Sequence, residues 1–134
     1  MNHVTRHYQG SIAGADTGVI PLYWGGMPAH MLPSATRSEP GSGSQGEQRV
    51  TPKNYVFAGD VQYKSFLLEI DGVATVKIEG TNDGPNEAGA VWSSYSVEHN
   101  TTTSVEVDSA CRFMRVNKVS GAGTVRVNAY MRSA

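Results

Sequence analysis

The sequence of 134 residues lacks most features that would indicate a chemical activity or a special environment. Its one cysteine, Cys111, cannot form an internal disulfide, so we expect a small, buried, apolar residue and no disulfide framework. No apolar run approaches the ~20 residues that a membrane-spanning helix needs. The first ten residues lack the apolar centre of a signal peptide. We therefore expect synthesis in the cytoplasm and no contact with a membrane.

An excess of charge of one sign is also missing. The chain has 11 lysines and arginines against 12 aspartates and glutamates, which gives a net charge of -1. This balance offers no electrostatic reason to expect direct binding of nucleic acid. The length fits one domain with a single hydrophobic core. No segment shows a convincing helical period, and there is no internal repeat.

Signatures of catalysis and of metal binding are absent as well. Ser93, Ser94 and Ser96 lack the glycine context of a nucleophile elbow, and no acid–base pair can be assembled. Asp83 is better interpreted as part of a turn than of a calcium loop, because further alternating carboxylates are missing. The four histidines form no complete ligand set: His3, His7, His30 and His99. We expect a non-enzymatic protein with no cofactor and no metal ion.

The clearest pattern that is present lies in the C-terminal quarter. Residues 112–117 alternate large apolar and polar side chains, which is the period-2 signature of a β-strand. Residues 124–131 alternate again, with Val125, Val127, Ala129 and Met131 in one phase. The cluster Ser-Gly-Ala-Gly at 120–123 separates the two segments and predicts a turn. We therefore predict a hairpin with one face toward a core.

Similar patterns precede this pair of strands. Residues 60–70 form a strong strand pattern, Asp71-Gly72 is a two-residue hairpin signal, and residues 73–79 alternate again. Further short strands are predicted over 91–97 and 103–107, giving about eight from residue 55 onward. Such a pattern is typical of an all-β sandwich or barrel. The shared phase predicts a buried core made of Phe66, Leu68, Ile70, Val76, Ile78, Phe113 or Met114, Val116, Val125 and Val127.

The N-terminal third is different. Residues 21–33 contain three prolines and two glycines, which exclude a helix and a central strand, yet bulky apolar side chains are frequent there. This segment either packs on its own domain or forms an arm that packs on a neighbouring subunit. Residues 34–47 have the composition of a flexible tether. We predict an extended arm and tether at 1–47 and a β-sandwich at 48–134. The predicted partner-binding residues are Leu22, Tyr23, Trp24, Met27, Met31 and Leu32.

Three segments resemble discoidin-like (coagulation factor C-type) and related jelly-roll domains. Val73–Gly84, VATVKIEGTNDG, is similar to their strand followed by Gly-(Ser/Thr)-Asn-Asp-Gly and a later tryptophan, here Trp92. Ala110–Val116 is similar to a later Ala-Arg-Tyr-Ile-Arg-Val strand, and Ser120–Tyr130 to the last Gly-x-Gly-x-Val-x-Val strand. The chain lacks the paired cysteines of secreted members. The resemblance covers about residues 61–132 and implies a jelly-roll-like antiparallel β-sandwich.

Compact jelly-roll chains with an arm are also similar in type to small capsid decoration (cement) proteins of tailed-bacteriophage virions. This likeness implies a non-enzymatic structural protein that binds the capsid shell and neighbouring copies of itself, with multivalent contacts strengthening weak single ones. The expected partners are the major capsid protein or other virion proteins, and a homo-oligomer is expected. The expected location is the virion, assembled in the host cytoplasm.

An alternative function is a carbohydrate-binding or tail-associated module. This hypothesis predicts exposed aromatic and polar groups gathered at one end of the sandwich. The candidate ligand-binding residues are Asn82, Trp92 and Tyr95.

Overall fold

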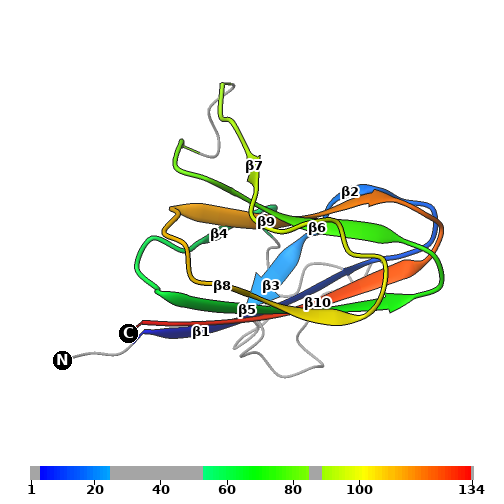
Figure 1. Cartoon of the computed structure of the whole chain (residues 1–134), viewed down its shortest axis with the longest axis horizontal. Helices are drawn as coiled ribbons and strands as arrows, with labels where there is room; N and C mark the ends of the chain where they lie inside the picture. The colour runs from blue at the N-terminus through cyan, green and yellow to red at the C-terminus, as the bar shows by residue number, and fades with distance from the viewer. Residues whose placement is uncertain (1–3, 25–52, 85–88, 134) are drawn as a thin grey trace, which may run out of the picture.

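The computed structural model describes residues 4–24, 53–84 and 89–133, and these ranges contain ten strands and no helix (Figure 1). The all-β prediction is confirmed. None of the described residues lies in a helix long and apolar enough to cross a membrane. The strands are β1 (Thr5–Ile12), β2 (Gly18–Val19), β3 (Leu22–Trp24), β4 (Val56–Phe57), β5 (Tyr63–Asp71), β6 (Thr75–Thr81), β7 (Ser93–Ser94), β8 (Thr103–Val107), β9 (Phe113–Ser120) and β10 (Thr124–Arg132).

The strands form two antiparallel sheets that pack face to face as the two layers seen in Figure 1. Sheet A has the order β3-β1-β10-β5-β8, and sheet B has the order β2-β9-β6-β7, with β4 also pairing with β9. Among the described strands, every consecutive pair except β6 and β7 lies in opposite sheets. The four strands β1-β10-β5-β8 facing β2-β9-β6-β7 have the order of a double-sheet jelly roll. The predicted jelly-roll-like sandwich is therefore confirmed.

The two predicted hairpins are wrong, although their strands and turns are present. β5 and β6 lie in different sheets, and so do β9 and β10; β5 instead pairs with β10, and β6 with β9. Each pair is therefore an arch that crosses from one sheet to the other. An arch and a hairpin require the same alternation of apolar residues and the same turn residues. The sequence pattern cannot distinguish an arch from a hairpin, because it does not show which strands pair with each other.

The two arches pack against each other at one end of the sandwich. Gly121 has a φ of 103°, and a Cβ added to it would lie 2.6 Å from the Cα of Ala74. The amide of Gly123 donates a hydrogen bond of 2.7 Å to the carbonyl of Val73. Any side chain at these glycines would separate the arches. The two glycines therefore allow the closest approach between the crossing connections.

A buried lysine closes each end of the sandwich. At the arch end, the ammonium group of Lys118 donates to the carbonyls of Gly14, at 2.5 Å, and of Gly123, at 2.6 Å. At the opposite end, the ammonium group of Lys64 donates to the carbonyl of Ser109, at 3.0 Å. The carbonyl groups belong to connections that cross between the sheets. Each lysine thus satisfies polar backbone groups at the place where the strands change layers.

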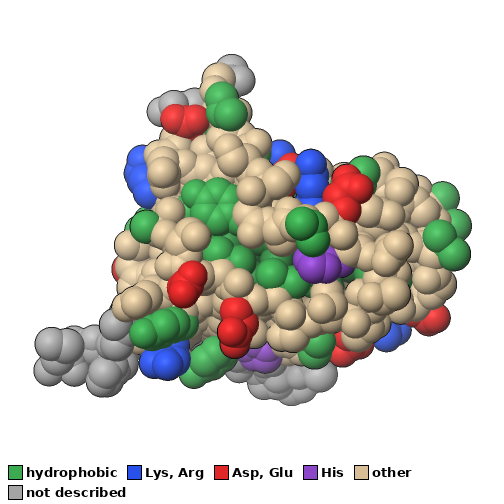
Figure 2. All heavy atoms as spheres, in the orientation of Figure 1, with side chains coloured by type: hydrophobic (Ala, Val, Ile, Leu, Met, Phe, Trp, Pro, Cys, Tyr) green, Lys and Arg blue, Asp and Glu red, His purple; other side chains and the backbone are tan. Residues whose placement is uncertain are grey.

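The core lies between the sheets and matches the predicted strand faces. Figure 2 shows hydrophobic side chains between the two layers on the side of β8. Met114 rather than Phe113 is buried, and Ile70 is only partly buried and packs at the margin. The other predicted core residues are confirmed as buried: Phe66, Leu68, Val76, Ile78, Val116, Val125 and Val127.

The predicted boundary at residue 47 is wrong, because the described N-terminal residues belong to the sandwich. β1 pairs along eight residues with β10, near the middle of sheet A (Figure 1). Leu22, predicted to bind a partner, is 1% exposed and belongs to the domain's own core, while Tyr23 lies on the outer face of sheet A. The backbone of Trp24 pairs with Tyr8. The remaining predicted arm contacts lie outside the described residues: the Trp24 side chain, Met27, Met31 and Leu32.

Replacing Val116 by aspartate should destabilise the domain. Val116 is fully buried opposite Ile78, and an unpaired buried charge costs about 3–5 kcal/mol. The matched control is Val119→Asp on the same strand, because Val119 is 40% exposed. We expect the control to lose less than about 1 kcal/mol. Urea denaturation of both variants is the measurement, and equal losses would contradict the assigned strand face.

Replacing Gly121 by alanine should separate the stacked arches. Gly18 is a suitable control, because its φ of 113° is similar but a Cβ there would meet nothing within 4 Å. Both alanine variants carry the backbone strain of a positive φ, whereas Gly121→Ala also forces atoms apart. We expect Gly121→Ala to lose about 1–3 kcal/mol more than Gly18→Ala in denaturation experiments. If the two variants were equally stable, the packing of the arches would not matter.

Candidate functional site

Large aromatic and arginine side chains gather on the outer face of sheet B. They come from β4, β9 and the segments beside them, and we call this surface the aromatic–arginine face. It is made of Tyr55, Phe57, Trp92, Arg112, Phe113 and Arg115. Phe113 and Arg115 alternate along β9 with the buried Met114 and Val116, so the same period that builds the core places these two side chains outside.

The aromatic part of this face is a cluster of three rings. Phe57 lies opposite Phe113 in the pairing of β4 with β9, with ring centroids 5.5 Å apart. Tyr55 meets Phe113 edge to face at 5.6 Å. The guanidinium of Arg112 lies 5.3 Å from the Phe113 ring, and that of Arg6 lies 6.0 Å from Phe57. Phe57 nevertheless remains 43% exposed, so the cluster presents a large aromatic surface to solvent.

Arg6 also fixes the loop behind this cluster. Its guanidinium forms an ion pair with Asp60 and donates to the carbonyl of Phe57 at 3.2 Å. The hydrogen bond from Arg6 lowers the pKa of the Asp60 carboxyl, and the same bond raises the pKa of Arg6. The first strand of the chain is thereby tied to the loop that follows Phe57.

The second part of the face is a stack of charged and aromatic groups. The Nε of Arg115 donates to the carboxylate of Glu79 at 2.7 Å, and Lys77 lies 3.3 Å from the same carboxylate. The guanidinium of Arg115 lies 4.1 Å from the centroid of the Trp92 ring. Glu79 is buried, so the ion pair is shielded from water. Arg115 and Trp92 are therefore held in one orientation before any partner binds.

The loop after β6 is fastened beside the aromatic–arginine face. The side-chain oxygen of Asn82 accepts a hydrogen bond from the amide of Arg112 at 3.0 Å, and its carbonyl accepts another from the Arg112 guanidinium. Asp83 accepts from the amide of Val91 at 2.9 Å, and its own amide donates to Thr81. This supports the interpretation of Asp83 as a turn residue. No group of three or more metal-ligating side chains occurs within the described ranges.

The three predicted ligand-binding residues have different surroundings. Trp92 lies on the outer face of sheet B, and Asn82 is engaged with Arg112. Tyr95 packs at the inner side of sheet B: a Cβ on Gly80 would lie 2.9 Å from the Tyr95 ring. Burial raises the pKa of the Tyr95 phenol, and its hydroxyl lies 3.5 Å from the carbonyl of Ala110. Trp92 and Tyr95 thus lie on opposite sides of sheet B, and Asn82 is used by the fold.

Cys111 and Lys64 lie close to Tyr95 in the interior. Burial raises the pKa of the Cys111 thiol, and its sulfur lies 3.3 Å from the carbonyl of Phe113. Burial also lowers the pKa of the Lys64 ammonium group. The thiol is protonated and inaccessible at neutral pH, which confirms the expectation of a small buried residue.

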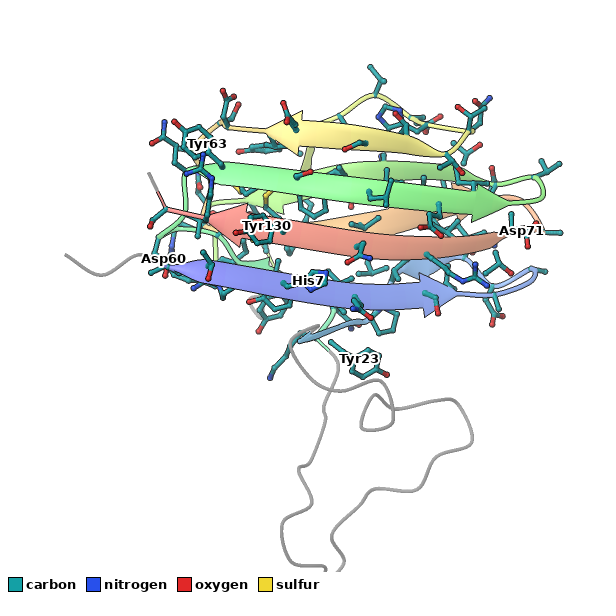
Figure 3. All side chains as sticks on the ribbon, turned by 90° about the horizontal axis from the view of Figure 1, so that it is seen from below. His7, Tyr23, Asp60, Tyr63, Asp71 and Tyr130 are labelled. Atoms are coloured by element: carbon teal, nitrogen blue, oxygen red, sulfur yellow. The ribbon has the colours of Figure 1, made fainter. Side chains whose placement is uncertain are left out.

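The outer face of sheet A carries a second set of side chains, seen in Figure 3. His7 and Tyr130 face each other across β1 and β10, and Tyr23 lies at the edge on β3. The next rows along the strands are polar, with Gln9 opposite Asn128 and Arg126 opposite Glu69. An open groove of about 780 Å³ crosses these rows between β3 and β5.

Sequence reasoning missed the residues that shape both faces. The sequence pattern predicts Phe113 as a possible core residue and assigns no binding role to Arg115. A usable signal was present: the outward phase of residues 113–117 contains an aromatic and an arginine. The pairing of Phe57 with Phe113 had no such signal, because it joins segments 56 positions apart in the chain.

Comparisons of this chain with protein-family models, with curated proteins and with solved structures give no match.

Proposed function

We propose that this protein is a non-enzymatic structural protein that binds a protein shell through its aromatic–arginine face. In its most specific form, the proposal is that the chain is a capsid decoration protein of a virion, and that the virion is assembled in the host cytoplasm. The partners would be the major capsid protein and neighbouring copies of the chain. Direct binding of nucleic acid or of a membrane is not part of this proposal.

The composition of the aromatic–arginine face carries the proposal. Aromatic residues and arginine are enriched in the cores of protein interfaces and among the residues that dominate binding energy. Phe57 offers a ring that is 43% exposed, beside Phe113 and Arg112. Exposed aromatic surface beside arginines is typical of sites where proteins bind one another.

The rigidity of the face adds support. Arg115 is fixed by Glu79 on one side and by the Trp92 ring on the other. Groups that are already ordered lose little side-chain entropy on binding, so more of the contact energy is left for affinity. On a shell with many identical sites, even modest affinity for each site gives stable attachment through multivalent contacts.

The fold is compatible with this role but does not assign it. Jelly rolls occur in viral capsid proteins and also in lectin domains, so the architecture favours binding proteins in general. The likeness in type to phage decoration proteins favours a capsid over other protein partners. The aromatic–arginine face supplies the surface that such a protein requires.

Alanine at position 57 should weaken attachment to the shell. Phe57→Ala removes the exposed ring without opening the core, since its neighbour Val56 is the buried residue of β4. We expect at least a tenfold loss of affinity for particles that lack the protein, which corresponds to about 1.4 kcal/mol. Sedimentation of the purified protein with such particles measures the affinity.

The matched control is Tyr130→Ala, which removes a ring that is 49% exposed on the outer face of sheet A. This variant should bind like the unmodified chain. The proposal would be contradicted if Phe57→Ala bound as tightly as the unmodified chain. It would also be contradicted if the unmodified chain bound no particle.

A further inference from the structure

We infer that the groove on the outer face of sheet A binds a neutral oligosaccharide. The inference is independent of the proposed shell contact, which uses the opposite sheet. The groove crosses strands β3, β1, β10 and β5, and the turn after β1 forms one wall. Its main polar lining residues are Gln9, Ser11, Tyr23, Glu69, Arg126 and Asn128.

The strand register brings these side chains together in two adjacent rows. Tyr23 lies opposite Gln9, which in turn lies opposite Asn128. In the next row Ser11 lies opposite Arg126, and Arg126 lies opposite Glu69. Because residues of one phase point to the same side of a sheet, both rows face the groove. The rows come from four strands that are distant in sequence.

Several of these polar groups are not used by the fold. Arg126 and Glu69 are direct cross-strand neighbours, yet they form no ion pair with each other. In the described part of the chain, the side chains of Gln9, Glu69 and Arg126 have no hydrogen-bond partner. Asn128 is partnered, since its side-chain oxygen contacts the ring of His7. An amide, a carboxylate and a guanidinium are thus free to bind a ligand.

The charges of the groove favour a neutral ligand. Arg126 is the cationic side chain among the lining residues, and the carboxylates of Glu69 and Asp16 lie in the same lining. The two carboxylates disfavour an anion, and the guanidinium weakens the attraction of the carboxylates for a cation. A polyhydroxylated molecule can donate to Glu69, accept from Arg126 and do both with Gln9. This combination matches the hydroxyl groups of sugars.

Two tyrosine rings provide apolar surface for the C–H faces of sugar rings. Tyr23 borders the groove at the edge strand, and Tyr130 lies one row away on β10 with half of its surface exposed (Figure 3). A tyrosine combines a flat apolar body with a polar hydroxyl, which suits a ligand that is polar at its rim and apolar on its faces. Burial raises the pKa of Tyr23, so its phenol is neutral at physiological pH.

The dimensions of the groove suit an oligosaccharide rather than a single sugar. Its volume of about 780 Å³ lies in the upper part of the range of ~300–1,000 Å³ for small-molecule sites. The groove is partly open to solvent, so a chain can extend beyond the contacted rings. The ligand class is therefore a neutral oligosaccharide or polysaccharide of several rings.

Affinity electrophoresis of the full chain in gels containing soluble polysaccharides tests this inference. The probes are neutral glucans, mannans, galactans and xylans, with alginate and heparin as anionic comparisons. We expect retardation by at least one neutral polysaccharide. Arg126→Ala should reduce the affinity at least tenfold, and Tyr23→Ala should reduce it while Tyr23→Phe, which keeps the ring, retains it.

The matched control is Arg132→Ala on the same strand and face. Arg132 lies outside the groove and stacks 4.5 Å from the Tyr63 ring, so its removal should leave sugar binding unchanged. Absence of retardation by every neutral polysaccharide would overturn the inference, and so would retardation by the anionic probes alone. If Arg126→Ala bound as tightly as the unmodified chain, the groove would not be the site. Loss of binding in Arg132→Ala equal to that in Arg126→Ala would also exclude it.

Discussion

The structure depends on connections that cross between the sheets and on two buried lysines that hold them together. Lys118 joins the carbonyl of Gly14, after β1, to that of Gly123, between β9 and β10. Lys64 joins the connections before β5 and before β9 through the carbonyls of Gln62 and Ser109. A buried ammonium group is stable only where acceptors surround it, and the bent backbone at each end supplies them. The lysines and the crossing connections therefore stabilise one another.

This arrangement separates two outer surfaces with different chemistry. The crossing connections described lie at the ends of the sandwich, so the outer faces of the two sheets are formed by outward side chains of the strands (Figure 1). Sheet B carries stacked aromatic rings and arginines held by Glu79. Sheet A carries rows of polar groups bordered by tyrosines, and among the described residues Gln9, Glu69 and Arg126 have no side-chain hydrogen-bond partner. The first suits a protein partner and the second a hydroxylated ligand.

The sequence predicts the strands and their buried faces, because the alternation of apolar and polar residues indicates which side chains face the core. It identified the inward residues of β5, β6, β9 and β10, including Val116 and Val125. It does not predict the partners of those strands, so it predicts hairpins where the arches form and an arm where β1 joins sheet A. Pairing between β1 and β10 joins the two ends of the chain, and no local pattern encodes it. The candidate site was missed for the same reason, since Phe57 and Phe113 meet only through the pairing of β4 with β9.

Oxidative footprinting of the aromatic side chains tests most directly whether the two faces have different roles. Hydroxyl radicals modify exposed rings, and mass spectrometry compares the free chain with the chain bound to the capsid particle that we propose as its partner. Attachment should protect Phe57, Phe113 and Trp92, while Tyr63 and Tyr130 on the outer face of sheet A should remain as reactive as in the free chain. Protection of Tyr63 and Tyr130 with unchanged oxidation of Phe57 would contradict the assignment of the shell contact to sheet B.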